Sequence, residues 1–140
     1  MTKVLVFGTF DGLHPGHLAF LSEARDQADE VVVAVAQDLI IEQLKKRAPE
    51  RKLGERLAAL QKLGDVHEVV AGDSELGSYL CFQRLRPDIV AFGYDQTELA
   101  ADFKRFQQAT GDETSTVVLK PYHPDTFKSS LLKTNKSALV

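Results

Sequence analysis

Five short apolar runs recur along the chain, separated by segments in which apolar positions follow helical spacing. The apolar runs are Val4–Phe7, Val31–Ala36, Val66–Val70, Ile89–Phe92 and Thr116–Leu119. Their β-branched residues and nearly continuous apolarity are typical of strands that are covered on both faces, as in a parallel sheet. The pattern therefore predicts about five parallel strands.

The segments between these runs predict helices. Apolar residues repeat every three or four positions over Leu18–Ala28 and Leu53–Leu63, and two further helices are expected over Glu75–Arg86 and Glu98–Ala109. Strands that alternate with helices indicate an α/β fold, a doubly wound sheet with helices on both faces.

Two polar segments interrupt this alternation. Lys45–Lys52 is expected to form a loop entered from a helix end, and Pro121–Lys128 a second loop before a short last helix. The chain shows no internal repeat and no low-complexity tract. Residues 1–140 are therefore expected to form a single domain.

Charge and cysteine content exclude several functional classes. A net charge of −3 argues against broad binding to nucleic acid, although a local pocket can still hold a phosphate. No apolar stretch approaches the roughly 20 residues of a membrane-spanning helix, and the first residues lack the pattern of a signal peptide. Cys81 is the only cysteine, which excludes an internal disulfide and a cysteine zinc cluster. A cytoplasmic protein without a membrane or nucleic-acid partner is expected.

The segment Gly8–His17 follows the first predicted strand and opens the first predicted helix. Ligands of open parallel sheets bind at such turns, where free backbone N–H groups and the helix dipole attract anions. Pro15 suits a first helical turn, and Gly16 lets a phosphate approach the backbone. His14 and His17 can both face one site, because His17 lies three positions after His14. Two ordinary surface histidines or a metal site are the alternatives, but the chain offers no obvious cluster of further metal ligands.

Gly8–Asp11 followed by His14–His17 resembles the signature of the cytidylyltransferase-like nucleotidyltransferases. This superfamily includes glycerol-3-phosphate cytidylyltransferase, archaeal-type FAD synthase and phosphopantetheine adenylyltransferase. The resemblance extends over nearly the whole chain and implies a Rossmann-like version of the sheet. It also implies an enzyme that joins the nucleotide of a nucleoside triphosphate, ATP or CTP, to a small phosphate-bearing acceptor and releases pyrophosphate. Mg²⁺ bound with the triphosphate is expected, and a homodimer is the assembly that the relatives suggest.

Three further segments are similar to binding segments of this superfamily. Lys45, Lys46 and Arg56 correspond to basic residues that approach phosphates, although a solvated basic loop would explain either lysine alone. Gly93–Gln96 resembles the segment that contacts the ribose and base. Lys128–Ser130 resembles a helix start that holds terminal phosphates, where a simple N-cap would explain one serine equally well.

The resemblance therefore implies two sets of site residues and no metal ligand from the protein. The expected catalytic residues are His14, His17, Lys46 and Arg56. The expected nucleotide-binding residues are Gly8, Thr9, Phe10, Asp11, Gly16, Lys45, Gly93, Tyr94, Asp95, Gln96, Lys128, Ser129 and Ser130.

The choice of substrate depends on smaller segments. Val35–Asp38 and Gly93–Gln96 are similar to archaeal FAD synthases, which favours FMN adenylyltransferase activity. The alternative is a cytidylyltransferase that acts on CTP with glycerol 3-phosphate or another polyol or sugar phosphate. Tyr122–Ser130 departs from the runs typical of both branches, which indicates a different acceptor or an altered activity. A nucleotide-binding regulator without turnover is the alternative from another class.

Overall fold

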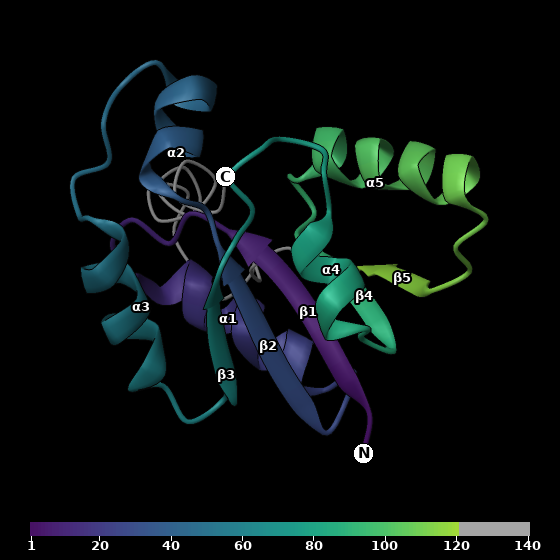
Figure 1. Ribbon diagram of the computed structural model, residues 1–140. Helices are drawn as coiled ribbons and strands as arrows, with labels where there is room; N and C mark the ends of the chain where they lie inside the picture. The colour runs from purple at the N-terminus through teal and green to yellow at the C-terminus, as the bar shows by residue number, and fades with distance from the viewer. Residues whose placement is uncertain (121–140) are drawn as a thin grey trace.

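Strand β1 (Lys3–Gly8) lies at the centre of a parallel sheet in this computed structural model, which describes residues 1–120 (Figure 1). The sheet has five strands in the order β3-β2-β1-β4-β5. All neighbouring strands pair in parallel, as the apolar runs predicted. The other four strands are β2 (Glu30–Val35), β3 (Glu68–Ala71), β4 (Ile89–Phe92) and β5 (Ser115–Val118).

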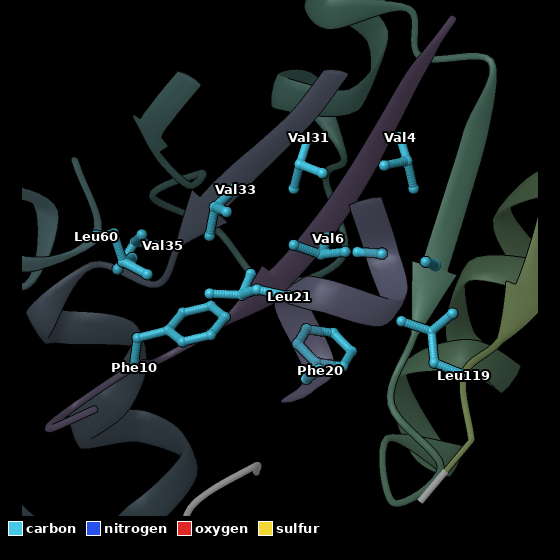
Figure 2. Packing of buried hydrophobic residues seen from close by; sticks show 12 residues of the cluster. Val4, Val6, Phe10, Phe20, Leu21, Val31, Val33, Val35, Leu60 and Leu119 are labelled. Atoms are coloured by element: carbon cyan, nitrogen blue, oxygen red, sulfur yellow. The ribbon is translucent and has the colours of Figure 1, made fainter. Parts of the chain in front are cut away.

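Side chains that alternate along each strand build two separate cores, one on each face of the sheet. Val4 and Val6 of β1 belong to one core, whereas Leu5 between them belongs to the other. The first core also holds Phe20 and Leu21, and Figure 2 shows these two side chains below the valines of β1 and β2. The helices within residues 1–120 are α1 (Pro15–Arg25), α2 (Asp38–Lys45), α3 (Leu53–Gln61), α4 (Leu80–Leu85) and α5 (Thr97–Thr110).

The helices divide between the two faces. The first core contains buried residues of α1 and α3, and the second contains buried residues of α4 and α5. Helix α2 follows the carboxyl end of β2 (Figure 1). This arrangement confirms the predicted doubly wound α/β sheet. No helix within residues 1–120 is long and apolar enough to cross a membrane.

The strand order creates a switch point between β1 and β4. The chain proceeds outward from β1 to β2 and β3, and then returns to the other side of β1 to form β4. In open parallel sheets, ligands bind beyond the carboxyl ends of the strands at such a point. The turn after β1 leads to His14 and His17 at the start of α1, and the turn after β4 carries Gly93–Gln96. Two segments that the sequence singled out separately therefore leave adjacent strands.

The expected helix over Glu75–Arg86 was wrong in its first half, because α4 begins only at Leu80. Gly77 and Tyr79 have φ values of 78° and 50°, and this left-handed backbone does not continue a right-handed helix. The carboxylate of Asp73 instead accepts hydrogen bonds from the backbone N–H groups of Leu80 and Cys81, at 2.7 and 2.8 Å. The spacing of apolar residues cannot indicate a helix start that depends on a carboxylate outside the helix. The other predicted helices and strands differ from the structure by up to three residues at their ends, and the expected last helix lies outside the described residues.

Asp73 should therefore stabilise the start of α4. Asp73→Ala removes the two backbone hydrogen bonds and a third from the Ser78 hydroxyl at 2.8 Å. We expect the free energy of unfolding in urea to fall by about 1–2 kcal/mol, the usual effect of losing a helix cap. Ser74→Ala, an exposed neighbour, is the control and should change it by less than about 0.5 kcal/mol. Equal stability of the two variants would contradict this role for Asp73.

Candidate active site

His14 forms the N-cap of α1 and presents one ring nitrogen away from the helix. Its Nδ1 accepts a hydrogen bond from the Gly16 backbone N–H at 2.9 Å, and Pro15 occupies the first helical position. An accepting Nδ1 places the proton of the neutral ring on Nε2. The Nε2 atom is buried and has no hydrogen-bond partner among the described residues. Burial also lowers the pKa of His14, so the ring is neutral near pH 7 and offers an N–H donor.

His17 lies directly beside His14, as the spacing predicted. The two ring centroids are 4.1 Å apart, and His17 is 2% exposed. The ring of Phe10 packs against His17 at a centroid distance of 5.2 Å and is itself buried. Phe10 adopts a left-handed backbone with φ of 50°. A side chain expected to meet the nucleotide therefore forms part of the core and supports His17.

Gly8 leaves the space that the Phe10 ring occupies. A Cβ atom on Gly8 would lie 2.6 Å from Cε2 of Phe10, which is closer than non-bonded carbon atoms approach. The role of Gly8 is thus to admit the ring that packs against His17.

Asp11 holds the loop between α2 and α3 against the turn that joins β1 to α1. Its two carboxylate oxygens accept hydrogen bonds from the backbone N–H groups of Glu50 and Arg51, each at 2.8 Å. Although burial acts in the opposite direction, these bonds and the nearby charges of Arg56 and Arg51 hold the pKa of Asp11 below its usual value. The carboxylate therefore remains ionised and holds the basic loop against the turn between β1 and α1.

The two lysines at the end of α2 occupy different environments. Lys45 is half-buried, and desolvation together with Arg47 lowers its pKa, while the nearby charge of Asp11 opposes this shift. Lys46 is exposed and ends the helix in a left-handed conformation with φ of 59°. Lys45 therefore lies close enough to Asp11 for their charges to interact.

Arg56 is fully buried beneath the site. Its Nε donates to the carbonyl of Arg51 at 2.9 Å, and its Nη1 donates to the carbonyls of Thr9 and Ala36 at 2.9 and 2.7 Å. Its Nη2 forms an ion pair with Asp38 at 2.6 Å. Four of the five N–H groups of this guanidinium are therefore engaged by protein acceptors, which join the ends of β1 and β2, the start of α2 and the following loop.

The turn after β4 is joined to β1 by Gln96. Its Nε2 donates to the Phe7 carbonyl at 2.9 Å, and its Oε1 accepts the Gly93 backbone N–H at 2.8 Å. Both carboxylate oxygens of Asp95 are buried and accept no hydrogen bond from any other described residue. Burial raises the pKa of Asp95, and its own backbone N–H offsets this only in part. Asp95 thus offers acceptors for ligand hydroxyl groups, and half-buried Tyr94 lies next to it in the chain.

The structure brings most of the predicted site residues to one edge of the sheet. Lys128, Ser129 and Ser130 lie outside the described residues. The contacts of Asp38 and Arg51 with the predicted site residues Arg56 and Asp11 had not been predicted, since they join positions distant in sequence. The segment Val35–Asp38, noted earlier for its similarity, was the one signal that could have indicated Asp38.

The comparison with protein families agrees with this arrangement. A family model described as cytidylyltransferase-like matches residues 5–136. The chain belongs to the cytidylyltransferase-like family. As a member of this nucleotidyltransferase family, the protein is an enzyme of the class that the first turn predicted.

Relatives of this cytidylyltransferase-like chain include FAD synthases from three archaea. The chain is 37% identical to the FAD synthase of Thermococcus sibiricus and 34% identical to that of Pyrococcus horikoshii, in each case over 96% of this chain and 88% of the relative. It is 43% identical to the FAD synthase of Methanosarcina barkeri over 69% of this chain and 67% of the relative.

Solved structures show the same fold. The lipopolysaccharide core biosynthesis protein of Thermoplasma volcanium superposes with a TM-score of 0.79 at 29% identity, covering 88% of this chain and 99% of the other. Pantothenate synthetase from Thermus thermophilus superposes with a TM-score of 0.60 at 19% identity, covering 99% of this chain and 65% of the other. These likenesses confirm the expected Rossmann-like sheet.

Gly8→Ala should disturb the support of His17. The added Cβ displaces the Phe10 ring, and forcing atoms into a filled core costs about 1–3 kcal/mol of unfolding free energy. Gly54→Ala in α3 is the matched control, because no atom lies within 4 Å of its added Cβ. The control should leave stability unchanged or raise it by about 0.5–1 kcal/mol in urea unfolding. Wild-type stability of Gly8→Ala would contradict the close packing described for Phe10.

Asp95→Asn should stabilise the free protein at neutral pH. Because the folded-state pKa of Asp95 is raised, its contribution to stability is greatest below about pH 4 and is lost as pH rises through that pKa. Urea unfolding should therefore show a gain of less than about 1 kcal/mol at pH 7, which shrinks towards pH 4.

Asp112→Asn is the control for Asp95→Asn, because the pKa of Asp112 is shifted in the opposite direction. Although burial opposes the shift, hydrogen bonds from Gln107 and Thr114 hold the pKa of Asp112 below its ordinary value. Its replacement should lower stability at pH 7. A loss of stability at pH 7 in both variants would argue against the unpaired state of Asp95.

Proposed function

We propose that this chain is an FMN adenylyltransferase, which transfers AMP from ATP to FMN to form FAD and pyrophosphate. The observation that carries the proposal is its similarity to FAD synthases over nearly its whole length. The paired histidines at the start of α1 and the buried acceptors of Asp95 fit the same chemistry.

The proposed reaction requires no nucleophile from the protein. A phosphate oxygen of FMN attacks the α-phosphorus of ATP, and the new P–O bond replaces the bond to the oxygen that bridges the α- and β-phosphates. The electron pair of the broken bond leaves with pyrophosphate. Because the acceptor is already an anion at neutral pH, the protein has to align two repelling anions and stabilise the charge that develops on the α-phosphate.

In this proposal, His14 and His17 stabilise that charge. The Nε2–H of His14 donates to a non-bridging oxygen of the α-phosphate, and the adjacent ring of His17 contacts the same group. The Gly16 backbone lies at the N-terminus of α1, where the helix dipole also favours the anion. The ribose hydroxyls donate to Asp95, in the turn held by Gln96.

The basic residues share the remaining charge in the proposed complex. Lys45 and Lys46 contribute mobile positive charges, while Arg56 positions the turn from below because protein acceptors engage its guanidinium. Lys128, Ser129 and Ser130 remain predicted ligands of the terminal phosphates. The homodimer and the cytoplasmic location remain predictions as well.

Nucleotidyltransferases of this kind generally use a divalent metal ion, and we propose Mg²⁺. Within residues 1–120 no three His, Cys, Asp or Glu side chains gather at a potential metal site. Both oxygens of the nearby Asp11 carboxylate already accept backbone N–H groups. Triphosphate oxygens would therefore provide most of the coordination, as is usual for Mg²⁺, and the ion would neutralise phosphate charge.

The proposed activity is tested by pyrophosphate release with Mg²⁺, crossing ATP and CTP with FMN and glycerol 3-phosphate. Turnover with ATP and FMN is the expected result, and FAD should appear in equal amount. Turnover with CTP and glycerol 3-phosphate alone would overturn the FMN adenylyltransferase proposal in favour of a cytidylyltransferase. No release from any pair, with nucleotide still bound, would indicate another acceptor or a regulator.

His17→Ala should lower kcat by about 100-fold or more, by analogy with the loss of an oxyanion donor. Leu18→Ala, at an exposed position of the same helix turn, is the control and should retain kcat. ATP affinity measured alongside shows whether the variant still forms the site. Near wild-type kcat for His17→Ala would show that this ring does not act on the transition state.

A further inference from the structure

A second arginine, Arg51, lies against the first turn. Its Nη1 atom is 2.8 Å from the point that a Cβ of Gly12 would occupy, and its Cζ is 3.6 Å from the same point. Gly12 has φ of 99°, a conformation that side chains with a Cβ rarely adopt. The missing side chain of Gly12 therefore gives the guanidinium room directly beside the turn that carries His14.

The backbone of Arg51 is fixed from both sides. Its N–H donates to Asp11 at 2.8 Å, and its carbonyl accepts from Nε of Arg56 at 2.9 Å. An exposed side chain on a loop ordinarily loses much conformational freedom when it binds a ligand. Here the loop is already held to the first turn, which reduces the cost of placing the guanidinium beside a substrate.

Arg51 forms no ion pair within residues 1–120, although its charge lies near enough to lower the pKa of Asp11. The two ion pairs found within residues 1–120 are Arg56 with Asp38 and Arg105 with Asp102, and Arg51 belongs to neither. The carboxylate oxygens of Asp11 already accept backbone N–H groups. Arg51 is exposed, whereas the guanidinium of Arg56 is enclosed. Within residues 1–120, Arg51 is thus an exposed arginine without an ion pair that lies against this turn.

The strand order indicates which part of the nucleotide Arg51 meets. Asp95 follows β4, the histidines follow β1, and Arg51 lies in the loop between α2 and α3, which follow β2. If the ribose lies at Asp95 and the α-phosphate at the histidines, the phosphate chain continues towards the β2 side. Half-buried Lys45 lies on this side too, near Asp11.

We propose that Arg51 binds the β- and γ-phosphates of the nucleoside triphosphate and stabilises the pyrophosphate as it leaves. This inference rests on the proposed function, since it assumes that a triphosphate is the nucleotide substrate. A guanidinium presents two parallel N–H donors to phosphate oxygens, a geometry that a lysine cannot reproduce. In this proposal Arg51 contacts the phosphates, and Arg56 positions Arg51 through the hydrogen bond to its carbonyl.

The test compares binding of ATP and AMP, each with Mg²⁺, to the wild-type protein and to Arg51→Gln. Arg51→Gln leaves both backbone hydrogen bonds of residue 51 intact, so urea unfolding should be close to wild type. We expect ATP affinity to fall by at least about 10-fold, because bonds to charged groups are the stronger hydrogen bonds, and AMP affinity to stay unchanged. Arg51→Lys should recover only part of the loss.

Arg25→Gln is the matched control for the loss of one positive charge. Arg25 ends α1, about 15 Å along the helix axis from the Pro15 end. It should leave the ratio of ATP to AMP affinity unchanged. The same fall in this control would show that net charge, rather than Arg51, determines the effect.

Two results would overturn the role of Arg51. One is an unchanged ratio of ATP to AMP affinity in Arg51→Gln. The other is a wild-type protein that binds ATP no more tightly than AMP. A rise in KM for FMN with unchanged ATP affinity would assign Arg51 to the acceptor instead. Failure of the proposed function appears separately, as absence of FAD formation by the wild-type protein.

Discussion

The site depends on the ion pair and the hydrogen bonds that the buried guanidinium of Arg56 forms. An ionised group removed from water is strongly destabilising unless charges and hydrogen bonds compensate it. Asp38 supplies the charge, and the carbonyls of Thr9, Ala36 and Arg51 accept three further N–H groups. Since these partners come from the ends of two strands and from the following loop, the guanidinium fixes their relative positions.

Hydrogen bonds between side chains and the backbone position the other turns of the site before any ligand binds. Asp11 holds the basic loop to the first turn, Gln96 holds the β4 turn to β1, and the backbone N–H of Gly16 orients the ring of His14. Each link uses a polar side chain to satisfy backbone groups at the open edge of the sheet. Little reorganisation is then needed in the reaction, which is the property that makes electrostatic stabilisation effective.

The sequence was sufficient for the features whose signals are local. Continuous apolar runs indicated the strands, and the spacing of His14 and His17 after the first run indicated a phosphate site. The contacts of Asp11 with Glu50 and Arg51 join positions 39 and 40 residues apart, and Arg56 meets Asp38 across 18 residues. No periodicity encodes such pairs, so the sequence indicated neither the contacts that bury Arg56 nor the contact of Arg51 with the turn after β1. The start of α4 was misplaced for a similar reason, because the side chain of Asp73 determines it.

If the nucleotide binds at Asp95 as proposed, the carboxylate also connects the stability of the folded protein with the supply of that ligand. A ligand that donates hydrogen bonds to these buried oxygens relieves a cost that the empty protein bears, and so binds the folded chain in preference to the unfolded one. Proteases and chaperones in the cell act on the unfolded fraction. With nucleotide as that ligand, as proposed, a shortage of it would shorten the lifetime of the protein and a plentiful supply would prolong it.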